Sequence, residues 1–178
     1  GDGYSIVEVQ APYGYVLNSN PVSFNVREDA SGEEGGVNVI EVIKENTAQK
    51  GIISVEKLGE VFSDVVTSGG ENQPSIYQPQ YAVQGLAGAK YEICAAEDIV
   101  TLDGTVRYSA GEVVDTITTG ENGVNSSKPL YLGKYEVHEV EAPFGMVLNS
   151  AVHTVELVYA GQTVEITETA TSCVNERQ

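Results

Sequence analysis

Tryptophan is absent from this chain of 178 residues, and phenylalanine, cysteine and methionine are scarce, with 3, 2 and 1 copies. Hydrophobic residues still make up 41% of the sequence, which is enough to bury a core but spreads apolar side chains thinly. Such thin spacing favours short strands over thick helices. No apolar run approaches the ~20 residues of a membrane span, and no basic-then-apolar signal segment opens the sequence. We therefore predict no membrane insertion in this part of the protein.

Basic residues are few as well, with 9 Lys and Arg against 26 Asp and Glu and a formal net charge of −17. This charge repels phosphate backbones and anionic lipid headgroups, which disfavours nucleic acid and membrane surfaces as partners. The acidic residues show no metal-loop spacing, and we find no GxSxG, HExxH, Walker or EF-hand motif. The sequence therefore predicts no enzymatic turnover, no cofactor and no metal site.

The apolar residues that are present mostly alternate with polar ones, which is the pattern of β-strands. The clearest alternating segments are 53–55, 89–93, 135–137 and 164–166. Turn residues separate such segments at 103–104, 120–123 and 160–161. Helix signals are weak throughout, so the sequence predicts an all-β sandwich.

One internal repeat determines the predicted domain organisation. Residues 4–19 align without a gap to residues 135–150, with ten of sixteen positions identical. About eighty residues of strand pattern precede the second copy, but only three residues precede the first. We therefore predict a complete domain at 51–178, the C-terminal part of an earlier domain at 1–47, and a short polar linker at 48–50.

The repeated pattern Tyr-x-x-x-Glu-x-x-Ala-Pro-x-Gly resembles the penultimate-strand motif of Cna B-type domains, which belong to Gram-positive surface adhesins and pilins. Residues 51–57 resemble the first strand of that family, and residues 88–93 resemble the second. The resemblance implies a prealbumin-like, reverse Ig-like β-sandwich. Met146 departs from the family pattern, because an aromatic residue usually follows the glycine.

The resemblance also implies a covalent bond that the domain forms with itself. In the family, a lysine on the first strand forms an isopeptide bond with an asparagine on the last strand, assisted by the glutamate of the motif. The matching residues in 51–178 are Lys57, Asn175 and Glu139. In 1–47 the matches are Glu8 and Asn46, and the lysine is missing, so that cross-link is incomplete.

Strand phase supports the first of these assignments independently of the family. Lys57 shares the phase of Ile53 and Val55, and Glu139 shares that of Val137, so both ionisable residues should point into the core. Burial favours a neutral amine and a neutral acid. Such a protonated Glu139 would bond the carboxamide oxygen of Asn175 and carry protons as ammonia leaves. An ordinary buried salt bridge, with Asn175 only ending a strand, is the alternative reading.

The two cysteines are expected to be free thiols rather than a disulfide. Cys173 has the inward phase of Asn175, whereas Cys94 has an outward phase, so their side chains should diverge. His138 also lies on an outward phase. Without partner clusters, His138 and His153 are expected to be surface residues.

Together these features predict a structural stalk module of a cell-wall-anchored, extracellular surface adhesin or pilus protein. Its partners would then be the neighbouring domains of the same protein. The alternative is a binding module in which residues 59–84 contact a host glycan or matrix protein, although an extra surface hairpin is the favoured reading of that segment. A third reading is a pilus subunit joined by sortase, for which we find no LPxTG-like signal.

Overall fold

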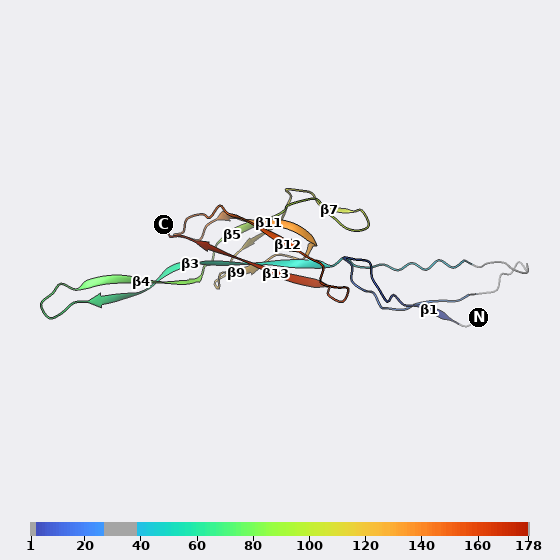
Figure 1. Cartoon of the computed structure of the whole chain (residues 1–178), viewed down its shortest axis with the longest axis horizontal. Helices are drawn as coiled ribbons and strands as arrows, with labels where there is room; N and C mark the ends of the chain where they lie inside the picture. The colour runs from blue at the N-terminus through green and yellow to red at the C-terminus, as the bar shows by residue number, and fades with distance from the viewer. Residues whose placement is uncertain (1–2, 27–38, 178) are drawn as a thin grey trace, which may run out of the picture. The chain divides into compact units, whose positions relative to one another are not determined.

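The computed structural model describes residues 3–26 and 39–177, and it divides into two compact units (Figure 1). Unit 1 comprises Gly1–Gln49 with Tyr159–Glu165, and unit 2 comprises Lys50–Val158 with Ile166–Gln178. None of the described residues belongs to a helix that is long and apolar enough to cross a membrane.

Unit 2 contains a first sheet built around one long strand. In it β3 (Lys50–Ser68) pairs parallel to β13 (Ile166–Asn175). The antiparallel partners of β3 are β4 (Ile76–Gly85), β9 (Val124–Ser126) and β10 (Leu130–Tyr131). The first and last long strands of the unit are thus neighbours.

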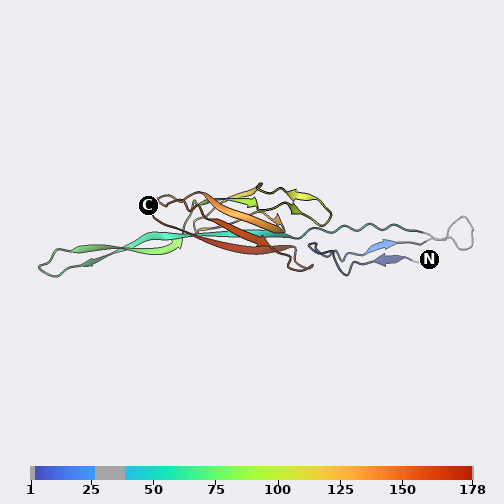
Figure 2. The same cartoon turned by 45° about the horizontal axis from the view of Figure 1, so that its top comes forward.

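The second sheet of unit 2 is fully antiparallel and has the order β12-β11-β5-β8. Its strands are β5 (Lys90–Ala95), β8 (Val113–Thr118), β11 (Gly133–Glu141) and β12 (Val152–Leu157). A two-stranded sheet adds β6 (Ile99–Val100) and β7 (Val106–Tyr108). The two larger sheets are stacked in Figure 2, which confirms the predicted all-β sandwich.

The core of unit 2 follows from the alternation along these strands. Ile53 and Val55 of β3 face Tyr91 and Ile93 of β5, and all four are almost fully buried in one cluster. Burying a side chain of this size stabilises the fold by about 1.5–3 kcal/mol. The alternation along the strands therefore accounts for much of the stability of the sandwich. Outward positions between them are polar.

The β3–β4 hairpin extends past the sandwich of unit 2, as its green segment shows in Figure 1. Phe62 and Tyr81 are paired across it, with their rings in edge contact at a centroid distance of 6.2 Å. Both residues are exposed. This arrangement confirms that the segment at 59–84 is a surface hairpin.

One predicted strand begins later than the sequence indicates. The pattern at 164–166 predicts a strand, but β13 begins only at Ile166. The backbone groups of Val164 are engaged elsewhere, because its N–H bonds the Gly161 carbonyl at 3.3 Å and its carbonyl accepts the Gln49 side chain at 2.5 Å. Gln49 is buried, and β3 begins at Lys50, both within the stretch 48–50 that the sequence predicts as a linker.

Unit 1 contains a small sheet in which β1 (Tyr4–Ile6) pairs antiparallel to β2 (Val22–Phe24). The Tyr4 and Phe24 rings stack across it, 5.8 Å apart. An isolated bridge joins Tyr15 to Ala48. β1 thus forms the first three residues of the first copy of the repeat.

Candidate functional site

Three polar side chains lie inside the sandwich of unit 2, each on a different strand. Lys57 is on β3, Glu139 on β11 and Asn175 at the end of β13, with 0%, 5% and 3% of their surfaces exposed. Their burial is what the strand phase predicts. Because β3 and β13 run parallel with Cys173 beside Lys57 and Asn175 beside Gly59, the lysine and the asparagine meet at the same end of the sheet.

The three side chains contact one another directly. The Lys57 Nζ donates to the Asn175 Oδ1 and lies 3.3 Å from the Glu139 Oε1. The Asn175 Nδ2 donates to both carboxyl oxygens of Glu139, at 2.9 Å each. The acid therefore touches the amine on one side and the amide nitrogen on the other.

The orientation of the Asn175 amide differs from the sequence-based expectation. We expected Glu139 to bond the carboxamide oxygen, whereas the structure turns the nitrogen toward Glu139 and the oxygen toward Lys57. The reason is the number of donors and acceptors, since the Asn175 Nδ2 donates to the Glu139 oxygens and the Lys57 amine donates to the remaining amide oxygen. In this orientation the acid lies next to the group that would leave as ammonia.

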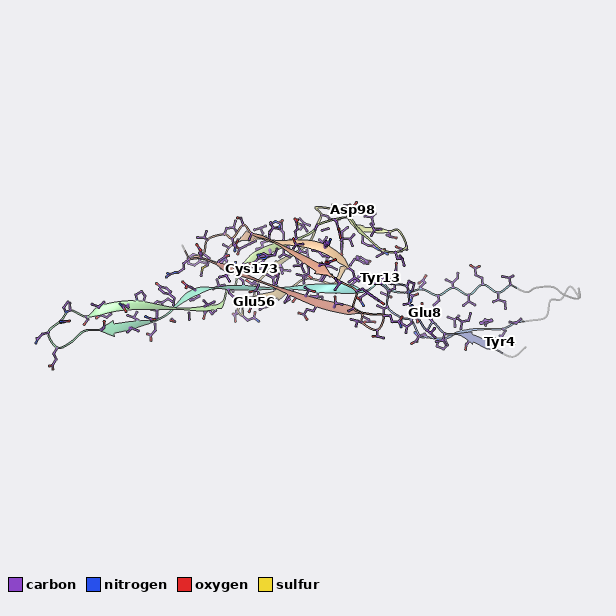
Figure 3. All side chains as sticks on the ribbon, viewed as in Figure 1. Tyr4, Glu8, Tyr13, Glu56, Asp98 and Cys173 are labelled. Atoms are coloured by element: carbon purple, nitrogen blue, oxygen red, sulfur yellow. The ribbon has the colours of Figure 1, made fainter. Side chains whose placement is uncertain are left out.

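The surroundings of the three residues exclude water. The Tyr91 ring lies 5.8 Å from the Lys57 Nζ, and Tyr91 pairs with Glu139 in the sheet register. Burial raises the pKa of Tyr91, as it does that of the Cys173 thiol (labelled in Figure 3). Both shifts have desolvation as their largest cause, so the site is a low-dielectric one in which polar contacts are strengthened.

A fourth residue, Asn149, contacts the site and was not among the predicted ones. Its backbone N–H donates to the Glu139 Oε2 at 2.8 Å, and its side chain donates to the Val174 carbonyl at 3.0 Å. Sequence offers one signal for it, because Asn149 and Asn18 occupy an identical position in the repeat.

Unit 1 holds the matching acid and asparagine, with a similar contact between them. The Asn46 Nδ2 donates to the Glu8 Oε2 at 2.7 Å, and the backbone N–H of Asn18 donates to the same oxygen at 2.9 Å. The Asn18 bond, then the Asn46 bond, lower the pKa of Glu8. Lys44 donates to the Asn20 carbonyl, so it is not the partner of Asn46.

The first copy of the repeat is more exposed than the second. Tyr4 (Figure 3) is 53% exposed and Ile6 45%, whereas the equivalent Tyr135 and Val137 are fully buried in unit 2. In unit 2 these positions are covered by the core that β3 and β5 build. Unit 1 thus displays an apolar strand face together with its acid–asparagine pair.

The remaining predicted positions are the two cysteines and the histidines. Cys94 and Cys173 are free thiols, as expected, and Cys173 is buried. His138 is partly exposed and lies 3.5 Å from Glu92 across the sheet, whereas the sequence suggested no partner for it. Side-chain pairing across neighbouring strands accounts for this contact.

Comparison with known families identifies the fold class and then the family. The SpaA prealbumin-like fold domain family matches residues 80–171. The chain therefore belongs to this family, and the resemblance to Cna B-type domains is confirmed. A comparison with curated proteins gives no match.

Solved structures agree with this fold. The chain is similar to the Bacillus anthracis TIE protein, with a TM-score of 0.54 and 24% identity over 99% of this chain and 25% of that one. It is also similar to GBS52, the minor pilin of Streptococcus agalactiae, with a TM-score of 0.44 and 14% identity over 75% of this chain and 48% of that one. For the major pilin SpaD of Corynebacterium diphtheriae the TM-score is 0.44 and the identity 19%, over 72% of this chain and 30% of that one.

The chain thus spans a quarter to about half of the length of these proteins. None of these matches supports the alternative in which residues 59–84 bind a host ligand.

Proposed function

We propose that residues 51–178 are a structural module of a Gram-positive pilus or surface adhesin, cross-linked by an isopeptide bond between Lys57 and Asn175. One observation carries the proposal: an amine, a carboxyl group and a carboxamide are in mutual contact inside a sandwich whose first and last long strands are neighbours. Unpaired buried polar groups are costly, so three of them gathered in a core suggest a purpose beyond packing.

The contacts support a mechanism for forming the amide between Lys57 and Asn175 with loss of ammonia. The neutral amine of Lys57 attacks the Cγ of Asn175, which forms the new C–N bond. Glu139 accepts a proton from the Lys57 Nζ and delivers one to the Asn175 Nδ2, which leaves as ammonia when the old C–N bond breaks. The products are a secondary amide and ammonia, and Glu139 returns to its starting state. The residues react once, so the module has no turnover.

Folding accelerates the cross-linking reaction by bringing its two reacting groups together. Lys57 and Asn175 are separated by 118 residues in sequence, and only the β3–β13 pairing brings them together. Holding two reactants in place converts a bimolecular step into an intramolecular one with a high effective concentration. The water-excluded site adds to this, because low dielectric strengthens the polar contacts that hold the three groups together.

A bond at this position would suit a module that carries tension. A pull applied to the start of β3 and the end of β13 shears these parallel strands against each other. With the cross-link present, the pull passes from β3 through the amide into the last residues of the chain. Backbone hydrogen bonds between the strands then no longer bear the load.

We further propose that residues 1–47 are the C-terminal part of a second such domain. Glu8 and Asn46 support this, since they repeat the contact of Glu139 with Asn175. No described lysine of unit 1 reaches Asn46, so this copy requires a lysine strand from outside 1–47. Neighbouring domains of the same extracellular, wall-anchored protein would be its partners.

Intact-mass spectrometry of the purified, denatured chain tests the central claim. We expect a mass lower than the sequence mass by one ammonia molecule, and the full mass in Lys57→Ala and Glu139→Ala. Fragmentation should place the cross-link between Lys57 and Asn175. An unshifted wild-type mass would overturn the proposal.

A further inference from the structure

Asn149 connects the acid of the site to the strand that carries the asparagine. Its backbone N–H bonds Glu139 at 2.8 Å, and its side-chain amide donates to the carbonyl of Val174, the residue just before Asn175. Its Oδ1 also accepts the Ala151 N–H at 3.0 Å, which holds the side chain in place. One residue thus reaches both members of the acid–asparagine pair.

The location of these bonds matters, because Asn175 ends a strand. β13 is the last strand along its sheet, and β3 pairs with only one of its sides. On the other side the Asn149 side chain binds the Val174 carbonyl, and the Val147 N–H binds the Glu176 carbonyl at 3.0 Å. These two bonds bracket Asn175 at a strand end, where fraying would otherwise move it.

Unit 1 repeats the arrangement with different surroundings. The Asn18 N–H bonds Glu8 at 2.9 Å, and the Asn18 side chain donates to the carbonyl of Glu45, directly before Asn46, at 3.2 Å. Its Oδ1 accepts the Asn20 N–H at 3.2 Å. All three bonds of Asn149 therefore have a counterpart in the first copy.

The two copies differ in whether a lysine strand is present. In unit 2 the pair contacts Lys57, whereas in unit 1 the equivalent apolar face is exposed and Lys44 donates to the Asn20 carbonyl, acting on Glu8 through its charge. The asparagine bonds are the same in both. Their formation therefore does not depend on the strand that brings the nucleophile.

We infer that Asn149 is a positioning residue that assembles the acid and the asparagine into a half-site before the lysine strand completes it. The inference rests on the proposed isopeptide bond, for which it adds a residue. Reacting groups must be held close to their reactive geometry, and a displacement of about 1 Å can cost roughly 100-fold in rate. Asn18 performs the same task for Glu8 and Asn46.

The rate of ammonia loss provides the test. The full chain is made by cell-free synthesis in a short pulse, and its intact mass is followed over time. We expect Asn149→Ala to slow the loss by about 10- to 100-fold. Asn149→Asp should be similarly slow, because a carboxylate can accept the Ala151 N–H but cannot donate to the Val174 carbonyl. A wild-type rate in either variant would overturn the inference.

Two matched variants control for the substitution itself. Asn18→Ala makes the same change in the copy without a lysine, and Ser150→Ala changes the exposed neighbour of Asn149. Both should react at the wild-type rate. If either is as slow as Asn149→Ala, the effect is not specific to the half-site and the inference fails.

A second measurement separates positioning from general stability. In the Lys57→Ala background no bond can form, so NMR hydrogen exchange at residue 149 reports the contact with Glu139 directly. We expect faster exchange in Asn149→Ala at a temperature well below the thermal midpoints of both proteins. Unchanged exchange would contradict the inference, as would a rate loss explained by unfolding alone.

The two proposals fail in different ways. If the wild-type chain never loses ammonia, the isopeptide proposal is wrong and the role in cross-linking falls with it. The exchange data on Asn149→Ala then decide only whether the Asn149 side chain orders the contact of residue 149 with Glu139. If the wild type reacts and Asn149→Ala reacts equally fast, the isopeptide proposal survives and the positioning role does not.

Discussion

Substitution of Lys57 by methionine should remove the cross-link while keeping most of the side-chain volume in the core. Bridging residues 118 apart restricts the unfolded chain. In the chain-entropy model a loop of this length is worth about 5 kcal/mol. Glu139→Gln should abolish the same bond by a different route, since it keeps the shape of the acid but cannot accept the proton. The two variants should therefore lose a similar amount of stability.

Thermal unfolding followed by circular dichroism measures this loss. At about 2–4 °C per kcal/mol, the midpoint should fall by roughly 10–20 °C in both variants, and both should have the full, unshifted mass. Lys134→Met, at an exposed position of β11, is the control and should keep the wild-type mass and midpoint. The reasoning is refuted if Glu139→Gln still loses ammonia, or if Lys57→Met melts at the wild-type temperature.

Three further predictions follow from packing and titration. Gly85→Ala should destabilise unit 2 by about 1–3 kcal/mol in urea unfolding, because a Cβ would lie 2.1 Å from a backbone oxygen, whereas Gly70→Ala has open space and should not. The lowered pKa of Glu8 means that its stabilising contribution is complete above the ordinary value of 4.5 and is lost as the pH falls through the lowered value, which an NMR carboxyl titration checks. In the folded protein, Cys94 should be alkylated before the buried Cys173, and equal rates would contradict the described burial.

Strand phase explains why much of the site could be predicted from sequence. Lys57 and Glu139 interrupt apolar faces, and a period of two is enough to place both inside a sandwich. The contact between Lys57 and Asn175 is less local, because it depends on β3 and β13 being parallel neighbours. Only the family resemblance indicated that pairing in advance.

Other features depend on contacts that no local pattern contains. Asn149 acts through the backbone carbonyl of Val174, and a carbonyl has no signature in sequence. The alternation at 164–166 suggested a strand, but Gln49 captures the Val164 carbonyl from a distant part of the chain. The amide orientation of Asn175 likewise follows from its neighbours in space.

The place of the β3–β4 hairpin along the chain keeps it out of the path of a pulling force. β3 continues beyond Lys57 to Ser68 before it turns back, so the whole hairpin lies on the far side of the proposed cross-link. When the chain is pulled at its two ends, the hairpin would therefore carry no load. Peptides, labels or whole domains grafted at its tip would therefore travel with the module without weakening it, which makes the tip the natural insertion point for engineering.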